Sequence, residues 1–495
     1  MAALGIPPLS PSALLPKGPS LSLREKISYG LGDVGNALAV SSVSFWLLIY
    51  FTDVAGLDPG MAGIAMMIGR VWDAIFDPIV GWITDRTQSK WGKRRPFLLY
   101  GAIPYACLYC AIWMVPDFAS QTAIFAYVTI ILICFNTCFA FIIVPYASLT
   151  ASMTSDYHER LSLTAFRMVA SQSAFLVGAA LPSALVFWVT HDGEQFFANS
   201  GLTGVMDFIF GSWAHTPRQG YAMFALSFGL LMVCSCWICF WGVRERTSAK
   251  TIHAHDHIFA YTLGIISALK HNKPYRMAVS ILCMSECAAA LVAINMPYFI
   301  QYVLKLEGDR TKILLSLFIG AIVAVPFWNR IARRYGKSET FTIVVRTYVL
   351  FICLLPFLPV GQVIPAMLLA FCGGICHSAA LMIPWSMIPD VVEYDELHHG
   401  SRREGLFYGG ALFSYKLATA VGVGLSGLSL KLVGYVANTP QSDNTILGMK
   451  VFICFAPSLF LISASLIAAR YPLTAAKHQE ILQQLDNKRA KETNS

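Results

Sequence analysis

Long apolar stretches separated by short polar connections make up most of the chain. Each stretch holds about 20 or more mainly apolar residues, the length that an α-helix needs to cross the hydrocarbon core of a bilayer. The pattern therefore predicts an all-α membrane protein with twelve transmembrane helices. Their expected ranges are 30–55, 60–84, 96–116, 121–150, 163–190, 220–243, 277–303, 311–332, 340–360, 364–389, 405–436 and 446–470.

Two short motifs recur after about half the chain. Trp91-Gly92-Lys93 returns as Tyr335-Gly336-Lys337, and Tyr50-Phe51 returns as Tyr298-Phe299. A parallel duplication of this kind is typical of the major facilitator fold, in which two six-helix halves hold the substrate between them near the bilayer midplane. We expect an N-terminal tail 1–28, a first half 29–243, a cytoplasmic linker 244–275, a second half 276–470 and a C-terminal tail 471–495.

Composition and charge agree with a membrane protein and indicate its orientation. Hydrophobic residues are 56% of the chain and charged residues 13%, where an average soluble domain has about 25% charged residues. Basic residues gather in the connections after the second, sixth and eighth stretches, so the positive-inside rule predicts that both termini are cytoplasmic. Orientation and anionic lipid explain the net charge of +8, so we expect no nucleic-acid partner. We expect a multi-pass monomer in the cell (inner) membrane.

The second apolar stretch carries a stripe of charge. At about 100° per residue, Arg70, Asp73 and Asp77 fall within about 60° of one another on a helix. An ionisable side chain at membrane depth costs about 3 kcal/mol, so the stripe must face water or charged partners rather than lipid. Two desolvated carboxylates repel each other, and a bound cation or proton relieves that repulsion. The stripe therefore predicts cation-coupled transport, with a structural Arg-Asp pair as the alternative.

The sequence lacks the motifs of common enzymes and pumps. It has no His-Glu-x-x-His zinc motif, no Gly-x-x-x-x-Gly-Lys-Ser/Thr phosphate loop and no Gly-x-Ser-x-Gly nucleophile elbow. The cysteines all lie in apolar stretches, where they behave as small hydrophobic residues. We therefore expect no enzymatic activity, no bound metal and no cofactor beyond a coupling cation.

An ordered set of motifs resembles one family. The motifs resemble those of the glycoside-pentoside-hexuronide:cation symporters of the major facilitator superfamily, which include melibiose permease and a sodium-dependent lysophosphatidylcholine symporter. The similarity extends over almost the whole chain. The motifs are Tyr29-Gly30-Leu31-Gly32-Asp33, Tyr50-Phe51-Thr52-Asp53-Val54, Asp73-Ala74-Ile75-Phe76-Asp77-Pro78, Trp91-Gly92-Lys93-Arg94, Pro145-Tyr146-Ala147, Asp390-Val391-Val392-Glu393-Tyr394 and Arg402-Arg403-Glu404-Gly405.

The resemblance implies a coupling site on the second stretch. The two aspartates that bind the cation in melibiose permease match Asp73 and Asp77, and a nearby arginine matches Arg70. Two neutral oxygen ligands of that site are missing, because their positions hold Phe76 and Ala140. An alkali cation needs several oxygen ligands and a proton needs one carboxylate, so proton coupling is favoured over sodium coupling.

The resemblance places the substrate site on several helices and changes its character. Positions that carry a lysine and an aspartate on the first helix hold Asn36 and Ala37, and the sugar-binding aspartate and tryptophan on the fourth helix are replaced by Ile143 and Ala147. A galactoside site needs those carboxylates and that aromatic plane. We therefore expect a larger and less polar substrate site.

Three further charges lie inside apolar stretches. Arg167 and Lys416 match charged positions of the family, and they form either a positive pair that holds an anionic substrate group or partners that neutralise Asp73 and Asp77. Glu286 lies on the seventh helix, which corresponds to the cavity-lining first helix, so it is a candidate substrate or protonation group.

The loop after the second stretch resembles a cytoplasmic gating loop. Its candidate gating residues are Asp85, Arg86, Arg94 and Arg95, although topology alone also explains basic residues there. Together these features predict a secondary active, cation-coupled symporter that moves a sugar, glycoside or hexuronide by alternating access. A lysolipid or other amphipathic anion is the alternative substrate. A non-transporting membrane sensor or enzyme on a transporter scaffold is the alternative of another class.

Overall fold

The computed structural model is helical throughout the part of the chain that it describes, which is residues 21–154, 157–191, 216–246, 265, 267–399 and 403–493. Each of the twelve predicted stretches corresponds to a helix or to a helix continued by a short turn. The elements are α1 (Leu23–Leu31), α2 (Val34–Ile49), η3 (Tyr50–Val54), α3 (Pro59–Arg86), α4 (Arg95–Trp113), α5 (Gln121–Met153), α6 (Tyr157–His191), α9 (Pro217–Gly242), α11 (Lys273–Tyr298), η5 (Phe299–Val303), η6 (Glu307–Asp309), α12 (Arg310–Tyr335), α13 (Lys337–Leu354), η7 (Leu355–Phe357), α14 (Val363–His399), α15 (Glu404–Leu432), α16 (Asp443–Ala468) and α17 (Ala475–Thr493).

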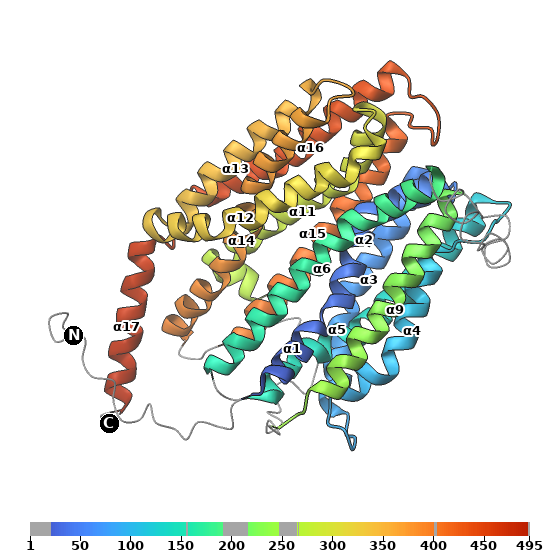
Figure 1. Cartoon of the computed structure of the whole chain (residues 1–495). Coiled ribbons are helices and arrows are strands. Elements are labelled where there is room, and N and C mark those ends of the chain that lie inside the picture. Colours follow the sequence, from blue (N-terminus) through green and yellow to red (C-terminus); the bar gives the residue numbers. More distant parts are fainter. Residues whose placement is uncertain are drawn as a thin grey trace.

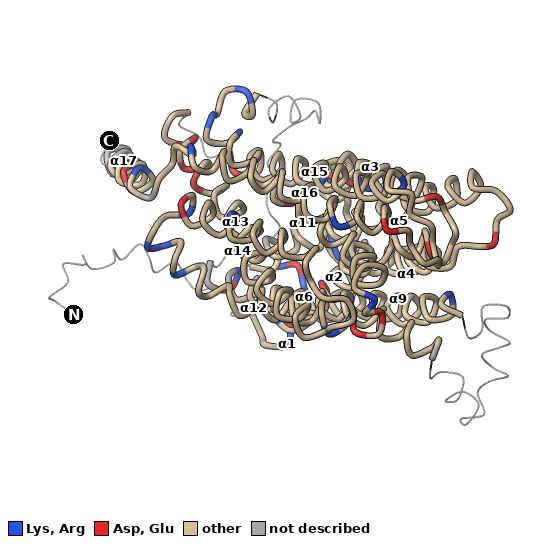
Figure 2. Tube along the Cα trace, turned by 90° about the horizontal axis from the view of Figure 1, so that it is seen from above, with Lys and Arg blue, Asp and Glu red and all other residues tan. Residues whose placement is uncertain are grey.

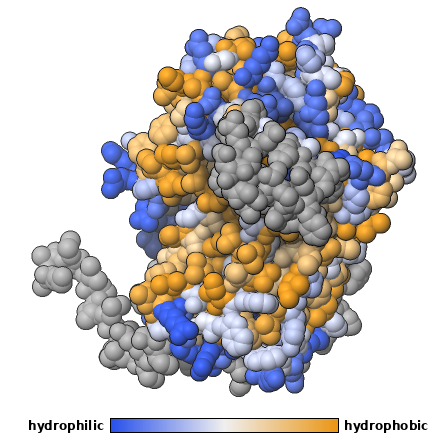
Figure 3. Space-filling model, turned by 45° about the vertical axis from the view of Figure 1, so that its right-hand side comes forward, coloured by the Kyte–Doolittle hydropathy of each residue, from blue (hydrophilic) through white to orange (hydrophobic). Residues whose placement is uncertain are grey.

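Eleven segments of the described chain are long and apolar enough to cross a membrane. The 28-residue helix α3 is not among them, because the charged stripe lowers its hydropathy. It nevertheless lies inside the bundle, where it packs against α5 and α15. On the face that Figure 3 shows, apolar side chains cover much of the surface and hydrophilic ones gather toward its upper and lower edges. Many large apolar side chains of the helices are exposed, as lipid contact requires.

The helices form two groups that follow the order of the chain (Figure 1). The first half contains α1 to α9 and the second half contains α11 to α16. They meet through α3 with α15, α2 with α11 and α6 with α12. The backbones of α3 and α15 approach closely at Gly63 and Gly427. A Cβ atom on Gly63 would lie only 2.8 Å from the Cα of Gly427, so a larger residue would not fit there.

Internal repetition is visible in the backbone. Both η3 and η5 are π-helical turns, closed by hydrogen bonds from Ala55 N to Tyr50 O (2.9 Å) and from Leu304 N to Phe299 O (3.0 Å). The structural repeat thus pairs Tyr50 with Phe299, one residue away from the pairing that the sequence suggested. In the equivalent loops of the two halves, Gly92 and Gly336 both have positive φ angles, 108° and 96°. No residue with a Cβ adopts this conformation without strain.

The two ends of the bundle differ. We call the end with η3 and η5 the outer end, and the end with α17 and the loop 87–94 the inner end, following the predicted topology. α17 turns back at the inner end and buries Ile481 and Leu485, while its His478 Nε2 lies 2.5 Å from Glu393 Oε2 on α14. Figure 2 shows Lys and Arg positions along the trace at this end of the second half.

Candidate transport site

Asp73 and Asp77 on α3 share one ammonium group from the other half of the protein. The Lys416 Nζ of α15 lies 2.8 Å from Asp73 Oδ2 and 2.5 Å from Asp77 Oδ2. Asp73 is buried, Lys416 is nearly so, and Asp77 keeps 27% of its side chain exposed. The α3–α15 contact creates this triad, which joins the two halves near the middle of α3.

Each of these aspartates retains one unused oxygen. Oδ1 of Asp73 and Oδ1 of Asp77 are buried and accept no hydrogen bond from any described residue. A buried carboxylate oxygen without a donor costs about 1–3 kcal/mol or more. A proton, a cation or water at these two oxygens would remove that cost. The two carboxylate oxygens therefore suit a coupling ion.

Hydrocarbon side chains occupy the two positions at which the family resemblance would place neutral oxygen ligands. Phe76 stacks on Trp72 with ring centroids 5.5 Å apart, and Ala140 is fully buried. Sequence reasoning did not select Asn136 of α5, whose amide Nδ2 donates to Leu132 O at 2.8 Å and which lines a small cavity with Arg70. Asn136 lies one helical turn before Ala140, and this spacing could have identified it as a site residue from the sequence.

A central cavity of about 290 Å³ lies between the halves beside Lys416. Its ionisable lining residues are Arg70, Glu286, His377 and Lys416, and most of the remaining wall is apolar. Phe45, Phe175 and Phe318 meet edge to face in this wall, with centroid distances of 5.7–6.5 Å, and bring together α2, α6 and α12. The site is therefore mainly apolar, and its volume lies at the lower end of the range of ligand pockets.

Two opposite charges in this cavity have no ion-pair partner among the described residues. Arg70 belongs to the first half and Glu286 to the second. Glu286 Oε1 accepts a hydrogen bond from Trp385 Nε1 at 3.3 Å, and Trp385 packs edge to face on Tyr415 at 5.5 Å. Across the cavity wall, His377 Nδ1 lies 3.2 Å from the hydroxyl of Tyr348.

Arg167 lies in a different cluster. Its Nε donates to Asp33 Oδ2 at 2.8 Å, and its guanidinium lies 5.1 Å from the ring centre of Tyr146. Asn36 Nδ2 contacts the other oxygen of Asp33 at 3.4 Å. Arg167 and Lys416 thus have separate carboxylate partners, and Arg167 does not line the central cavity. Asp33 was present in a family motif but was not predicted as a site residue.

The remaining predicted residues lie nearer the inner end. Ile143 is half-buried and Ala147 is exposed on α5, and neither lines the central cavity. Arg94 donates to Ser148 O and Ser152 Oγ, while Arg95 donates to Phe240 O at 2.6 Å. Both contacts stay within the first half.

The gating loop is held by a residue that follows directly after the first half. The Glu245 carboxylate accepts the backbone N–H groups of Lys93, Arg94 and Arg95 at 2.9–3.1 Å. Arg86 lies over the ring of Trp82 at 4.2 Å. The side chain of Asp85 and the backbone of Arg402 lie outside the described residues.

Polar contacts join the two halves at the outer end. Hydrogen bonds and ion pairs between described residues join them at Lys416 and at the outer end, for example Thr52 Oγ1 to Tyr298 OH at 2.8 Å and Ser183 Oγ to Thr311 Oγ1 at 2.8 Å. These bonds hold the outer ends of the two halves together in this conformation and close the cavity on that side.

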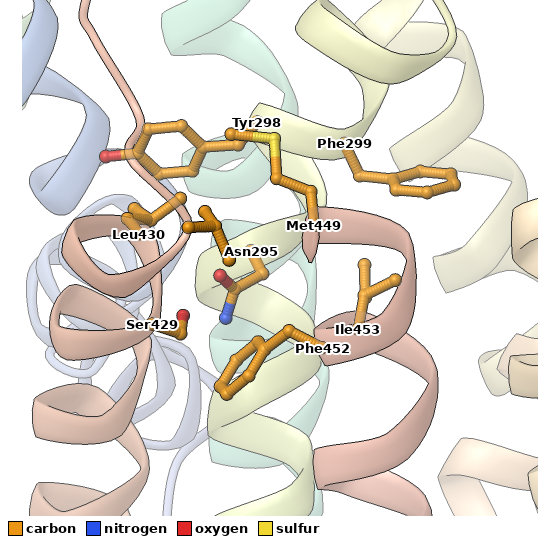
Figure 4. A pocket seen from close by; sticks show the side chains of 9 residues that line it. Asn295, Tyr298, Phe299, Ser429, Leu430, Met449, Phe452 and Ile453 are labelled. Atoms are coloured by element: carbon orange, nitrogen blue, oxygen red, sulfur yellow. The ribbon is translucent and has the colours of Figure 1, made fainter. Parts of the chain in front are cut away.

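A second cavity near the outer end is too small for a substrate. Asn295, Tyr298, Met449 and Phe452 are among its lining residues (Figure 4), and it holds about 10 Å³. That is room for about one water molecule. The central cavity is therefore the candidate site.

Comparison with known proteins agrees with this geometry. Residues 28–475 match the family model described as MFS/sugar transport protein. An uncharacterized symporter of Synechocystis sp. is 30% identical, over 94% of this chain and 97% of its own. The sodium-dependent lysophosphatidylcholine symporter 1-B of Danio rerio is 29% identical, over 96% and 92%.

A solved structure has the same fold. It is described as a bacterial homolog of the human lysosomal transporter Spinster in an inward-facing and unoccupied conformation. It superposes with a TM-score of 0.65 at 11% identity, covering 93% of this chain and 97% of that one.

Proposed function

Because the chain belongs to the MFS/sugar transport protein family, we propose that its central cavity carries an amphipathic substrate with both a positive and a negative group, by alternating access and in symport with a proton. The protein is a multi-pass membrane transporter, a cation-coupled symporter and not an enzyme. We further propose that it acts as a monomer, in the cell (inner) membrane, with cytoplasmic termini.

One observation supports this substrate class. Arg70 and Glu286 are opposite charges on opposite halves, both without an ion-pair partner among the described residues, in a cavity with mainly apolar walls. A buried charge is costly until it is paired. A headgroup that carries both charges would pair with both residues at once, and an alkyl chain would fill the apolar remainder.

A sugar fits these walls less well. Recognition of a hydroxyl array needs several polar acceptors and donors, because each unpaired hydroxyl buried by the site costs free energy. Besides Arg70, Glu286, His377 and Lys416, the cavity offers four hydroxyl groups, and its other lining residues are apolar. The hydroxyl groups belong to Ser44, Tyr348, Tyr415 and Thr419. Relatives of equal identity include both a lysophosphatidylcholine symporter and a glucuronide carrier homolog, so the choice rests on the cavity walls. Glycosides and hexuronides, which the sequence predicted first, are the competing outcome of the test.

Lysophosphatidylcholine is expected to stabilise the purified protein more than a matched lysophosphatidate, a neutral alkyl glycoside or an alkyl glucuronide. Glu286→Gln should weaken lysophosphatidylcholine binding by about tenfold, because it removes the partner of the cationic group, and should leave lysophosphatidate binding within about twofold. Thermal-shift titrations would measure both effects. Stronger stabilisation by the glucuronide or the glycoside, with no effect of Glu286→Gln, would contradict the proposal and support the sugar class.

The coupling step is proposed to act through Lys416. Its ammonium group on α15 holds both aspartates of α3, so it links the halves beside the cavity. A proton on either carboxylate weakens that attraction and loosens the link. Coupling then follows from competition between the proton and Lys416 for the same carboxylates.

Uptake into proteoliposomes should follow an imposed pH gradient and change less than about twofold when sodium replaces potassium at constant pH. The physical reason is the lack of oxygen ligands at Phe76 and Ala140. Initial rates of labelled substrate uptake, with each gradient imposed alone, would separate the ions. A steep sodium dependence at fixed pH would assign sodium instead, with backbone carbonyls or water as the missing ligands.

A further inference from the structure

A half-buried carboxylate at the outer end accepts hydrogen bonds from three hydroxyl groups. Asp53 Oδ1 accepts from Thr52 Oγ1 at 2.6 Å and from Tyr435 OH at 2.5 Å, and Asp53 Oδ2 accepts from Tyr302 OH at 2.5 Å. Thr52 lies beside Asp53 in the first half, whereas both tyrosines belong to the second half. The two cross-half bonds are short, as expected for hydroxyls that donate to a carboxylate.

More bonds surround this carboxylate. Asn438 donates its Nδ2 to Asp53 O at 2.5 Å and its backbone N–H to the Tyr302 hydroxyl at 3.3 Å. The rings of Tyr298 and Tyr302 each pack edge to face on Tyr435, with centroids 5.3 Å apart. One side chain of the first half is therefore enclosed by aromatic and amide groups of the second.

The internal repeat explains why these groups meet. Asp53 lies in the π-turn η3 and Tyr302 in the equivalent π-turn η5, at matching positions of the two turns. A π-turn holds one more residue than an α-helical turn, and such turns are frequent at functional sites. Here both turns bring a polar residue to the interface between the halves.

We propose that Asp53 and its hydroxyl donors Tyr302 and Tyr435 form the outer gate of the transporter, a latch that must open in every cycle before the cavity can face the outer side. Alternating access requires the outer ends to separate, and these bonds join them in the present conformation. Asp53 thus positions the two halves for transport without contacting the substrate.

Asp53→Asn tests the latch, because it keeps the shape of the side chain but removes the charge and one of the two acceptor oxygens. Hydrogen exchange of the full-length protein in nanodiscs should become at least about tenfold faster in the outer segments 55–60 and 433–441. At the same time, exchange should slow at the inner ends of α5 and α14, because the halves close there as they open outside. This measurement needs no substrate, so it can fail or succeed independently of the proposed function.

Matched variants keep the test decisive. The double variant Tyr302→Phe and Tyr435→Phe retains all rings and should give the same opposite changes if Asp53→Asn does not fold. Asp58→Asn removes an exposed ion pair with Lys431 (3.1 Å) at the same end and should change exchange less than about twofold. Faster exchange at both ends would indicate a purely structural role. That result, or unchanged exchange in the tyrosine variant, would overturn the proposal.

Discussion

Replacing either Asp73 or Asp77 by asparagine is expected to abolish uphill accumulation of substrate, with a fall of at least about 100-fold in the concentration ratio reached in proteoliposomes. Both carboxylates contact Lys416, and each keeps one unused buried oxygen. Without one carboxylate, the coupling ion loses its site and no longer competes with the ammonium group. Downhill exchange of substrate should persist, because the cavity itself is unchanged.

The comparison needs a control for the loss of charge alone. Asp309→Asn removes a carboxylate from an outer turn, where Asp309 pairs with the exposed Lys312 at 2.6 Å. Its uptake should match that of the unmodified protein. If both the Asp73 and the Asp77 variants still concentrate substrate, the coupling site lies elsewhere and the role assigned to the stripe is wrong.

The bundle was predictable because the bilayer imposes a strong length requirement. Each stretch of about 20 apolar residues became a helix, and the family resemblance that the motifs indicated is confirmed by the match over residues 28–475. The stripe on α3 was visible because three charges in an apolar helix conflict with lipid. Local sequence therefore identified the helices and their unusual residues.

Partners across the bundle could not be predicted in the same way. Asp77 and Lys416 are 339 positions apart, and only the α3–α15 contact at Gly63 and Gly427 brings them together. The sequence left two partners open for Lys416, an anionic substrate group or the aspartates, because pairing depends on the rotation of both helices. Arg167 likewise pairs with Asp33, which lies in the turn between α1 and α2 of the same half.

The outer latch could not be predicted from the sequence for another reason. Asp53 belongs to one of the family motifs, but a π-turn has no sequence signature as clear as helical periodicity. Without that turn, the direction of the Asp53 side chain cannot be deduced. The one-residue shift between the sequence repeat and the structural repeat, Tyr50 with Phe299, has the same origin.

Lys416→Met is expected to be the most destabilising of these substitutions. It keeps the length of the side chain but leaves Asp73 and Asp77 close together without their shared cation. Breaking a buried ion pair by removing one partner costs about 3–5 kcal/mol, because the remaining charge stays buried and unpaired. The free energy of unfolding in detergent micelles should fall by this amount, measured by denaturant or thermal unfolding.

A second substitution should reverse much of that loss. In Lys416→Met with Asp77→Asn, one uncompensated carboxylate remains instead of two, so more than half of the lost stability should return, and the two effects should be strongly non-additive. Lys312→Met, whose side chain is 63% exposed in its pair with Asp309, should cost less than about 1 kcal/mol. If Lys416→Met is equally mild, or if Asp77→Asn destabilises it further, Lys416 does not neutralise the aspartates, and its charge is instead free to hold a substrate anion.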